Sequence, residues 1–157
     1  MSPRADEALA KVHAELEALE GIVRTTSDAD WSKPCPGEDW PVALVAFHIA
    51  RAFQRQAEFV EDAQAGRGPH QFDWGDTHAL NAGVAAEHPA PSKDEVVALG
   101  TKSVERIASV IDGLADADLD RVAFVYDGKD RSVLWVVGTL AVRHARGHRE
   151  SIAAALS

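Results

Sequence analysis

The strongest constraint on the fold of this chain is a helical repeat of apolar residues in four long segments. In residues 5–23 the apolar positions follow one another at intervals of three and four, at Leu9, Val12, Leu16, Leu19 and Val23. This spacing forms one face of an α-helix, and comparable stripes run through residues 42–64, 96–114 and 133–157. A chain of 157 residues suits one hydrophobic core. The sequence therefore predicts an all-α fold, an antiparallel four-helix bundle that occupies residues 1–157 as one domain.

Three capping positions indicate where helices begin. Asp39 is expected to be the N-cap of the second long helix, with Pro41 in its first turn. Ser92 and Glu95 stand in the order S-K-D-E, the capping box that precedes a third long helix. Ser132 is expected to cap a final helix that runs to the C-terminus.

The second and third long helices are joined by a long connection. Glycines and a proline in residues 65–75 predict a loop, followed by a short helical piece around residues 78–88. His70 and His78 flank Trp74, so the loop over residues 66–78 is a candidate cover for a pocket, although a surface position is favoured for both histidines. Residues 121–132, RVAFVYDGKDRS, combine alternating apolar residues with a DG turn. They predict either a small hairpin or an extended connection before the last helix.

Charge and composition exclude several classes of protein. The net charge of −9 repels a phosphate backbone, so no nucleic-acid partner is expected. Cys35 is the one cysteine, which rules out an internal disulfide and favours a reducing compartment. The start of the chain has no apolar signal core, and the longest near-apolar run, residues 133–142, is too short to span a bilayer. We expect a cytoplasmic protein with small-molecule substrates and no membrane partner.

Two histidines in the last helix are the first candidates for chemistry. At about 100° per residue, His144 and His148 share a face with apolar residues, whereas Arg146 and Arg149 lie on the opposite face. Side chains four residues apart on a helix overhang the same patch and can bind one ion. A stable site needs a third ligand from another helix, and His48 lies on the apolar face of the second helix.

Other interpretations of these histidines and other known motifs find less support in the sequence. Buried histidines often only satisfy hydrogen bonds, and surface positions are favoured for His13, His70, His78 and His88. H-E-x-x-H, E-x-x-H and the phosphate-binding loop G-x-x-x-x-G-K-[ST] are all absent from the sequence, which argues against a zinc protease, a carboxylate-bridged di-iron bundle and a nucleotide triphosphatase. Three neutral imidazoles suit zinc, nickel, copper or iron and do not select among them.

Several other residues are weaker candidates for roles at the site. Arg51 and Arg55 lie close to the face of His48, where either can meet an anionic substrate, although a solvated or salt-bridged arginine is the simpler interpretation. Asn81 is a candidate for contact with a metal-bound ligand, or for a helix cap or turn. Trp40 is expected to pack at the helix start or to form a pocket wall. A metal or redox role for Cys35 is not favoured.

Several of these segments together resemble the DinB-like superfamily, which includes the mycothiol-dependent maleylpyruvate isomerase metal-binding domain. The stretch CPGEDWPVALVAFHIA at 35–50 resembles the start of that family's second helix, and LAVRHARGHRESI at 140–152 resembles its final His-x-x-x-His helix. Asn81 and the segment 92–96 match the middle of such domains. The resemblance covers essentially the whole chain.

The resemblance implies a four-helix bundle, often dimeric, with a divalent metal ion, usually zinc or nickel, held by His48, His144 and His148. Characterised relatives transfer or isomerise substrates with low-molecular-weight thiols such as mycothiol or bacillithiol. The maleylpyruvate isomerase has a second C-terminal domain, for which this chain is expected to have no room, and has Glu where this chain has His144. These two differences argue against maleylpyruvate isomerisation itself. From the resemblance we expect a metal-dependent thiol S-transferase or isomerase, with Arg55 and Asn81 as secondary catalytic candidates.

Two other functions stay open from the residues alone. An open position on a three-histidine ion can take water instead of a thiol, which would make the protein a hydrolase. A bundle that only holds a metal or binds a ligand is the non-catalytic alternative, and a homodimer is compatible with each of these functions.

Overall fold

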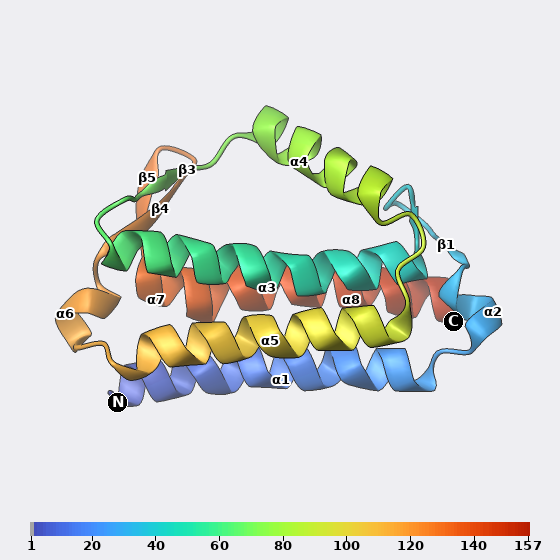
Figure 1. Ribbon diagram of the computed structural model, residues 1–157, viewed down its shortest axis with the longest axis horizontal. Coiled ribbons are helices and arrows are strands. Elements are labelled where there is room, and N and C mark those ends of the chain that lie inside the picture. The colour runs from blue at the N-terminus through green and yellow to red at the C-terminus, as the bar shows by residue number, and fades with distance from the viewer. Residues whose placement is uncertain (1) are drawn as a thin grey trace.

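Four long helical segments lie lengthwise against one another in the computed structural model, which describes residues 2–157 (Figure 1). The prediction of an all-α four-helix bundle is confirmed. The four segments are α1 (Pro3–Thr25), α3 (Val42–Gln64), α5 (Lys93–Asp112) and a final helix made of α7 (Val133–Trp135), η1 (Val136–Leu140) and α8 (Ala141–Leu156).

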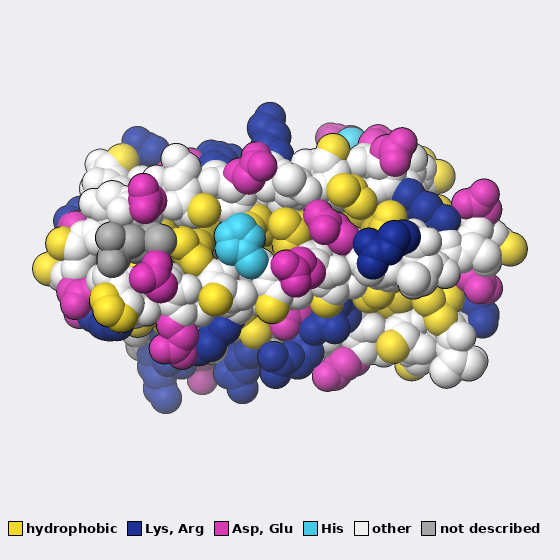
Figure 2. All heavy atoms as spheres, turned by 90° about the horizontal axis from the view of Figure 1, so that it is seen from below, with side chains coloured by type: hydrophobic (Ala, Val, Ile, Leu, Met, Phe, Trp, Pro, Cys, Tyr) yellow, Lys and Arg dark blue, Asp and Glu magenta, His cyan; other side chains and the backbone are white. Residues whose placement is uncertain are grey.

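The predicted apolar stripes form the core of the bundle. Each long helix contributes side chains with no exposed surface, including Leu19, Phe53, Ile107 and Ile152. Gly100 lies where α5 approaches α1, and a Cβ atom at this position would meet Leu16 Cδ1 at 3.1 Å. The close approach of these helices therefore favours glycine at this position. Figure 2 shows the face seen from below, on the side of α1, where acidic, basic and apolar side chains lie next to one another. No helix of residues 2–157 combines the length and the hydropathy that crossing a membrane requires.

Two of the three predicted helix caps are present. Ser92 and Glu95 form a complete capping box, in which the Ser92 side chain accepts from the Glu95 N–H and Glu95 accepts from the Ser92 N–H. Ser132 caps the final helix through a hydrogen bond from the Trp135 N–H.

The prediction that Asp39 caps the second long helix is wrong. After the short helix α2 (Asp28–Trp31), the strands β1 (Pro34–Cys35) and β2 (Trp40–Pro41) form a small antiparallel hairpin. Asp39 lies in its turn with φ of 57°, a left-handed conformation that Asp tolerates better than most residues. The helix α3 begins only at Val42, with Pro41 as its N-cap and no side-chain cap.

The predicted hairpin before the last helix is present and gains a third strand. After α6 (Asp116–Leu119), β4 (Val122–Tyr126) and β5 (Lys129–Ser132) pair antiparallel across the predicted DG turn. The additional strand, β3 (His70–Gln71), comes from the long connection and pairs parallel with β4. This pairing ties the connection to the end of the bundle.

The helical piece in the long connection is longer than predicted. It begins at Trp74 and ends at Glu87 as α4, because Asp73 caps it by accepting from the Asp76 N–H. No residue of α4 is buried. In Figure 1 the helix lies over α3, outside the four long segments of the bundle.

The final helix contains one irregular turn. Within η1 the hydrogen bonds span five residues, and the Ala141 N–H donates to the Val136 carbonyl. Such a π turn holds one more residue than an α-helical turn. It directly precedes the helix α8, which carries His144 and His148.

Candidate metal centre

The three histidines singled out in the sequence lie together between α3 and α8. His48 Nε2 is 3.0 Å from His144 Nε2. One ring nitrogen from each of His48, His144 and His148 lies within 4.8 Å of the other two. This group of residues is able to hold a metal ion.

The spacing of these nitrogens fits one ion. A tetrahedral zinc site with Zn–N bonds of about 2.0–2.1 Å places its ligand nitrogens about 3.4 Å apart. The separations in the structure, from 3.0 Å to at most 4.8 Å, bracket this value, so small side-chain adjustments suffice. The three donors are nitrogen atoms, the set preferred by zinc, nickel and other borderline metals.

A carboxylate that sequence reasoning did not single out orients one of the three rings. His148 Nδ1 is 2.9 Å from Glu38 Oε1. Because an ionised carboxylate only accepts hydrogen bonds, Nδ1 carries the proton and donates it, which leaves Nε2 of His148 free to bind a metal. Metal-binding histidines commonly have such a partner. Glu38 belongs to the turn of the small hairpin, ten positions before His48 in the sequence, so no local motif connects it with the histidines.

Burial keeps two of the three imidazoles neutral. Removal from water lowers the pKa of His48 to about 4; the neighbouring His148 contributes, while Glu38 opposes the shift. Burial also lowers the pKa of His144 well below its ordinary value, with further contributions from His48 and His148. Near neutral pH both rings are therefore in the uncharged form that binds metals.

The histidines form one wall of a pocket that lies beneath α4. Its larger part, the outer lobe, has a volume of about 750 Å³ and reaches all three histidines as well as Glu38 and Trp40. A smaller inner lobe of about 140 Å³ runs along α3 from His48 and His144. Asn81 of α4 lines both lobes. The long connection therefore covers the site.

The structure places the weaker sequence candidates at different distances from this pocket. Trp40 lines the outer lobe with its ring centroid 5.2 Å from that of His48. Arg51 and Arg55 line the inner lobe. Cys35 is buried, and burial followed by the charge of Glu38 raises the pKa of its thiol, which disfavours the reactive thiolate.

Two sequence interpretations are corrected by the structure. A surface position was favoured for His70, but its ring is half-buried, stacks on Phe59 at a centroid distance of 4.4 Å and lines the inner lobe. Parallel pairing of β3 with β4, which has no local sequence signal, draws it inward. The face opposite the histidines was expected to carry solvated charge, but Arg149 on this face donates to the buried Glu15 of α1 at 2.8 Å. The surface position is correct for His78, which is exposed and stacks on Trp74.

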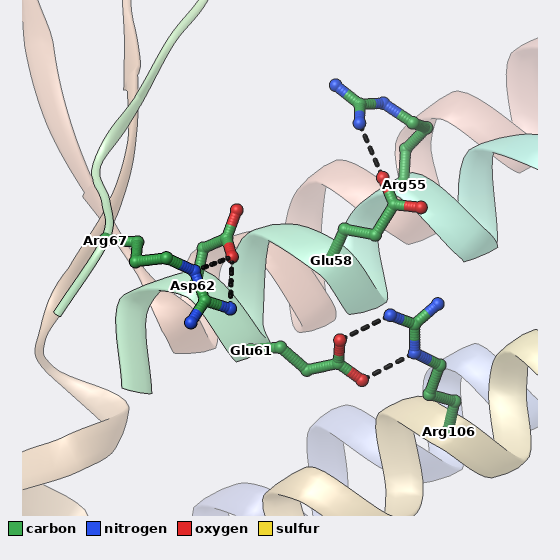
Figure 3. Close-up of polar contacts among 6 residues, drawn as sticks. All are labelled: Arg55, Glu58, Glu61, Asp62, Arg67 and Arg106. Atoms are coloured by element: carbon green, nitrogen blue, oxygen red, sulfur yellow. Dashed lines mark hydrogen bonds and ion pairs between the residues drawn. The ribbon is translucent and has the colours of Figure 1, made fainter. Parts of the chain in front are cut away.

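Ion pairs lie on two sides of α3, the side that faces the pocket and the side that faces the bundle (Figure 3). Arg55 and Glu58 pair on one side of α3, while Glu61 pairs with Arg106 of α5 on the other. At the end of the helix Asp62 pairs with Arg67. Arg55 is therefore a salt-bridged arginine, as the simpler interpretation expects, and it also lines the pocket.

The fold and the site together define a class of protein: a helical bundle in which a long connection covers a cluster of three histidines. The sequence pattern of the DinB superfamily matches residues 7–152, and the chain belongs to this superfamily. No curated protein matches the chain. Among solved structures, an uncharacterized protein from Clostridium difficile 630 is similar, with 15% sequence identity and a TM-score of 0.74 over 98% of this chain and 96% of that one. At this identity the likeness shows a shared fold.

Proposed function

We propose that this protein is a metal-dependent enzyme that uses a zinc or nickel ion on His48, His144 and His148 to activate a low-molecular-weight thiol. The thiol would be of the mycothiol or bacillithiol type, and the reaction would be thiol transfer or isomerisation. One observation carries the proposal: three imidazole nitrogens within 4.8 Å of one another face a pocket of about 750 Å³. Three protein ligands beside an accessible space are typical of a reactive site, since structural zinc sites usually have four.

The chain's own residues would prepare this site for a thiol. A bound divalent ion would lower the pKa of a coordinated thiol, which makes it a nucleophile at neutral pH. His48 and His144 are held neutral by burial, and Glu38 fixes the orientation of His148. Asn81 offers an amide to a ligand in either lobe, and Trp40 and Phe72 provide apolar walls of the outer lobe.

The metal ligands can be tested by substitution. The protein is expressed and purified without nickel chromatography, and its metal content is measured by mass spectrometry. We expect about one zinc or nickel ion per chain in the wild type and a loss in H48A, H144A and H148A. The control is H13A, because His13 is exposed on α1. Undiminished metal in all three variants would contradict the proposed site.

The thiol step needs a separate measurement. Cobalt substitution makes the site visible in absorption, and a titration with mycothiol or bacillithiol should produce a sulfur-to-cobalt charge-transfer band. Thiol-dependent turnover of an electrophile would then be screened. A spectrum that responds to neither thiol, combined with hydrolysis of an ester or amide panel, would support the hydrolase alternative. A spectrum that no added ligand changes would support the non-catalytic bundle.

A further inference from the structure

The inner lobe contains a charged stripe that the proposed metal chemistry does not use. His48, Arg51, Arg55 and Phe59 follow one another on α3 at intervals of three and four, and all four line this lobe. Side chains at this spacing are neighbours on one helix face, with Cβ atoms about 5–6 Å apart. Two guanidinium groups therefore share a small cavity with one of the candidate metal ligands.

Arg51 has no acidic partner among residues 2–157 within ion-pair distance. It is half-buried, in a chain with 25 acidic and 16 basic residues. Placing a charge in a partly desolvated pocket without a counter-ion costs free energy, and an anionic ligand would supply the missing charge.

Arg55 adds positive charge to the same lobe although it has a partner. One of its nitrogens pairs with Glu58 Oε2, and its guanidinium carbon lies 4.9 Å from the centroid of the Phe59 ring. In Figure 3 the other end of the guanidinium points away from Glu58. Its charge reaches His70 of β3, which also lines the lobe and whose imidazole pKa is lowered by burial and then by Arg55.

A buried amide without a partner also lines the lobe. Gln56 is 3% exposed, and its Oε1 has no hydrogen-bond partner. Buried polar atoms are nearly always hydrogen-bonded. A rotation of the amide by half a turn would offer its NH₂ group at this position, so Gln56 can donate to a ligand oxygen.

The inner lobe is small and much of its remaining wall is apolar. Phe59, Phe124 and Leu140 are among its walls, and its volume is about 140 Å³. An apolar protein cavity of about 150 Å³ binds benzene. The lobe therefore suits one ring or a chain of similar size that carries a single charged group.

We propose that the inner lobe binds the carboxylate of a small apolar acid, with Arg51 as the main counter-ion and Arg55 as the second. The apolar part of the acid packs against Phe59 and Phe124 at one end of the lobe, and its carboxylate lies at Arg51, about one helical turn from His48. A small apolar acid is thereby the substrate class of the proposed metal-dependent reaction, and this part of the inference rests on the function proposed above. The anion site itself requires neither the metal nor the thiol.

The test measures binding of benzoate and of its neutral isostere benzamide to metal-free protein by titration calorimetry. We expect benzoate to bind at least tenfold more tightly than benzamide. R51Q should remove this preference, R51K should retain part of it, and R143Q is the control because Arg143 lines the outer lobe only. In wild-type protein, benzoate should shift the ¹⁵N-labelled Nε resonances of Arg51 and Arg55 and leave that of Arg143 in place, a readout that needs no variant to fold.

Three results would overturn the assignment. Equal binding of benzoate and benzamide would show that the lobe does not select a charge. A benzoate preference that R51Q leaves unchanged, or that R143Q removes, would place the anion elsewhere. Binding that appears only after zinc is added would show that the carboxylate goes to the metal. Because the assay omits both metal and thiol, a failed cobalt–thiol titration and a failed benzoate titration remain separate outcomes.

Discussion

The hydrogen bond between Glu38 and His148 makes the sharpest prediction about the metal centre. Both side chains are largely shielded, with exposures of 15% for Glu38 and 23% for His148, and the contact is 2.9 Å long. Loss of such an outer partner typically weakens metal binding 10- to 100-fold, which corresponds to about 1.4–2.7 kcal/mol. We expect E38Q, which keeps an acceptor oxygen but loses the charge, to bind zinc about tenfold more weakly than the wild type. E38A, which loses both, should approach 100-fold.

The measurement is competition for zinc against a chromophoric chelator at a fixed pH. D39N is the matched control, because Asp39 lines the same outer lobe and has no hydrogen bond or ion pair to a histidine in the described chain. Asn also adopts the left-handed conformation of Asp39 readily, so the turn should be preserved. If E38Q and E38A bind zinc within twofold of D39N, the orienting role of Glu38 is refuted.

Three further predictions concern stability, each measured by urea unfolding. Zinc at 100 times its dissociation constant should raise the free energy of unfolding by about 2.7 kcal/mol in the wild type but not in H144A; equal stabilisation of both would place the ion elsewhere. F53A should cost about 3–5 kcal/mol, because Phe53 is fully buried; a loss below about 1 kcal/mol would contradict the packing. S92A removes the capping side chain of α5 and should cost about 1 kcal/mol, whereas an unchanged midpoint would show that the cap contributes nothing.

The helices and the histidine cluster were accessible from the sequence because both depend on local periodicity. The three- and four-residue spacing of apolar side chains gave the four long helices, and the same period placed His48, His144 and His148 on inward faces. A side chain's direction on a helix follows from its position in the sequence. Two inward-facing helices that pack together then bring these rings close.

Features that depend on chain reversal were not accessible in this way. Asp39 carries the side chain of a good N-cap, but the hairpin formed by β1 and β2 requires it in a left-handed turn. Glu38 reaches His148 only because the hairpin packs against α8. His70 becomes a pocket residue through strand pairing with a segment more than fifty positions away. Non-local pairing of this kind leaves no periodic signal in a single sequence.

The π turn before α8 has a consequence for how the last helix tolerates changes in length. Each residue of a regular helix advances the face by about 100°, and η1 accommodates one residue more than a regular turn. We expect a one-residue deletion within residues 136–140 to be absorbed by conversion to an ordinary α-turn, with the imidazoles still aimed at their common centre. The same deletion between His144 and His148 would swing one ring about 100° aside. The π turn therefore allows the helix before α8 to lose one residue without rotating the face that carries His144 and His148.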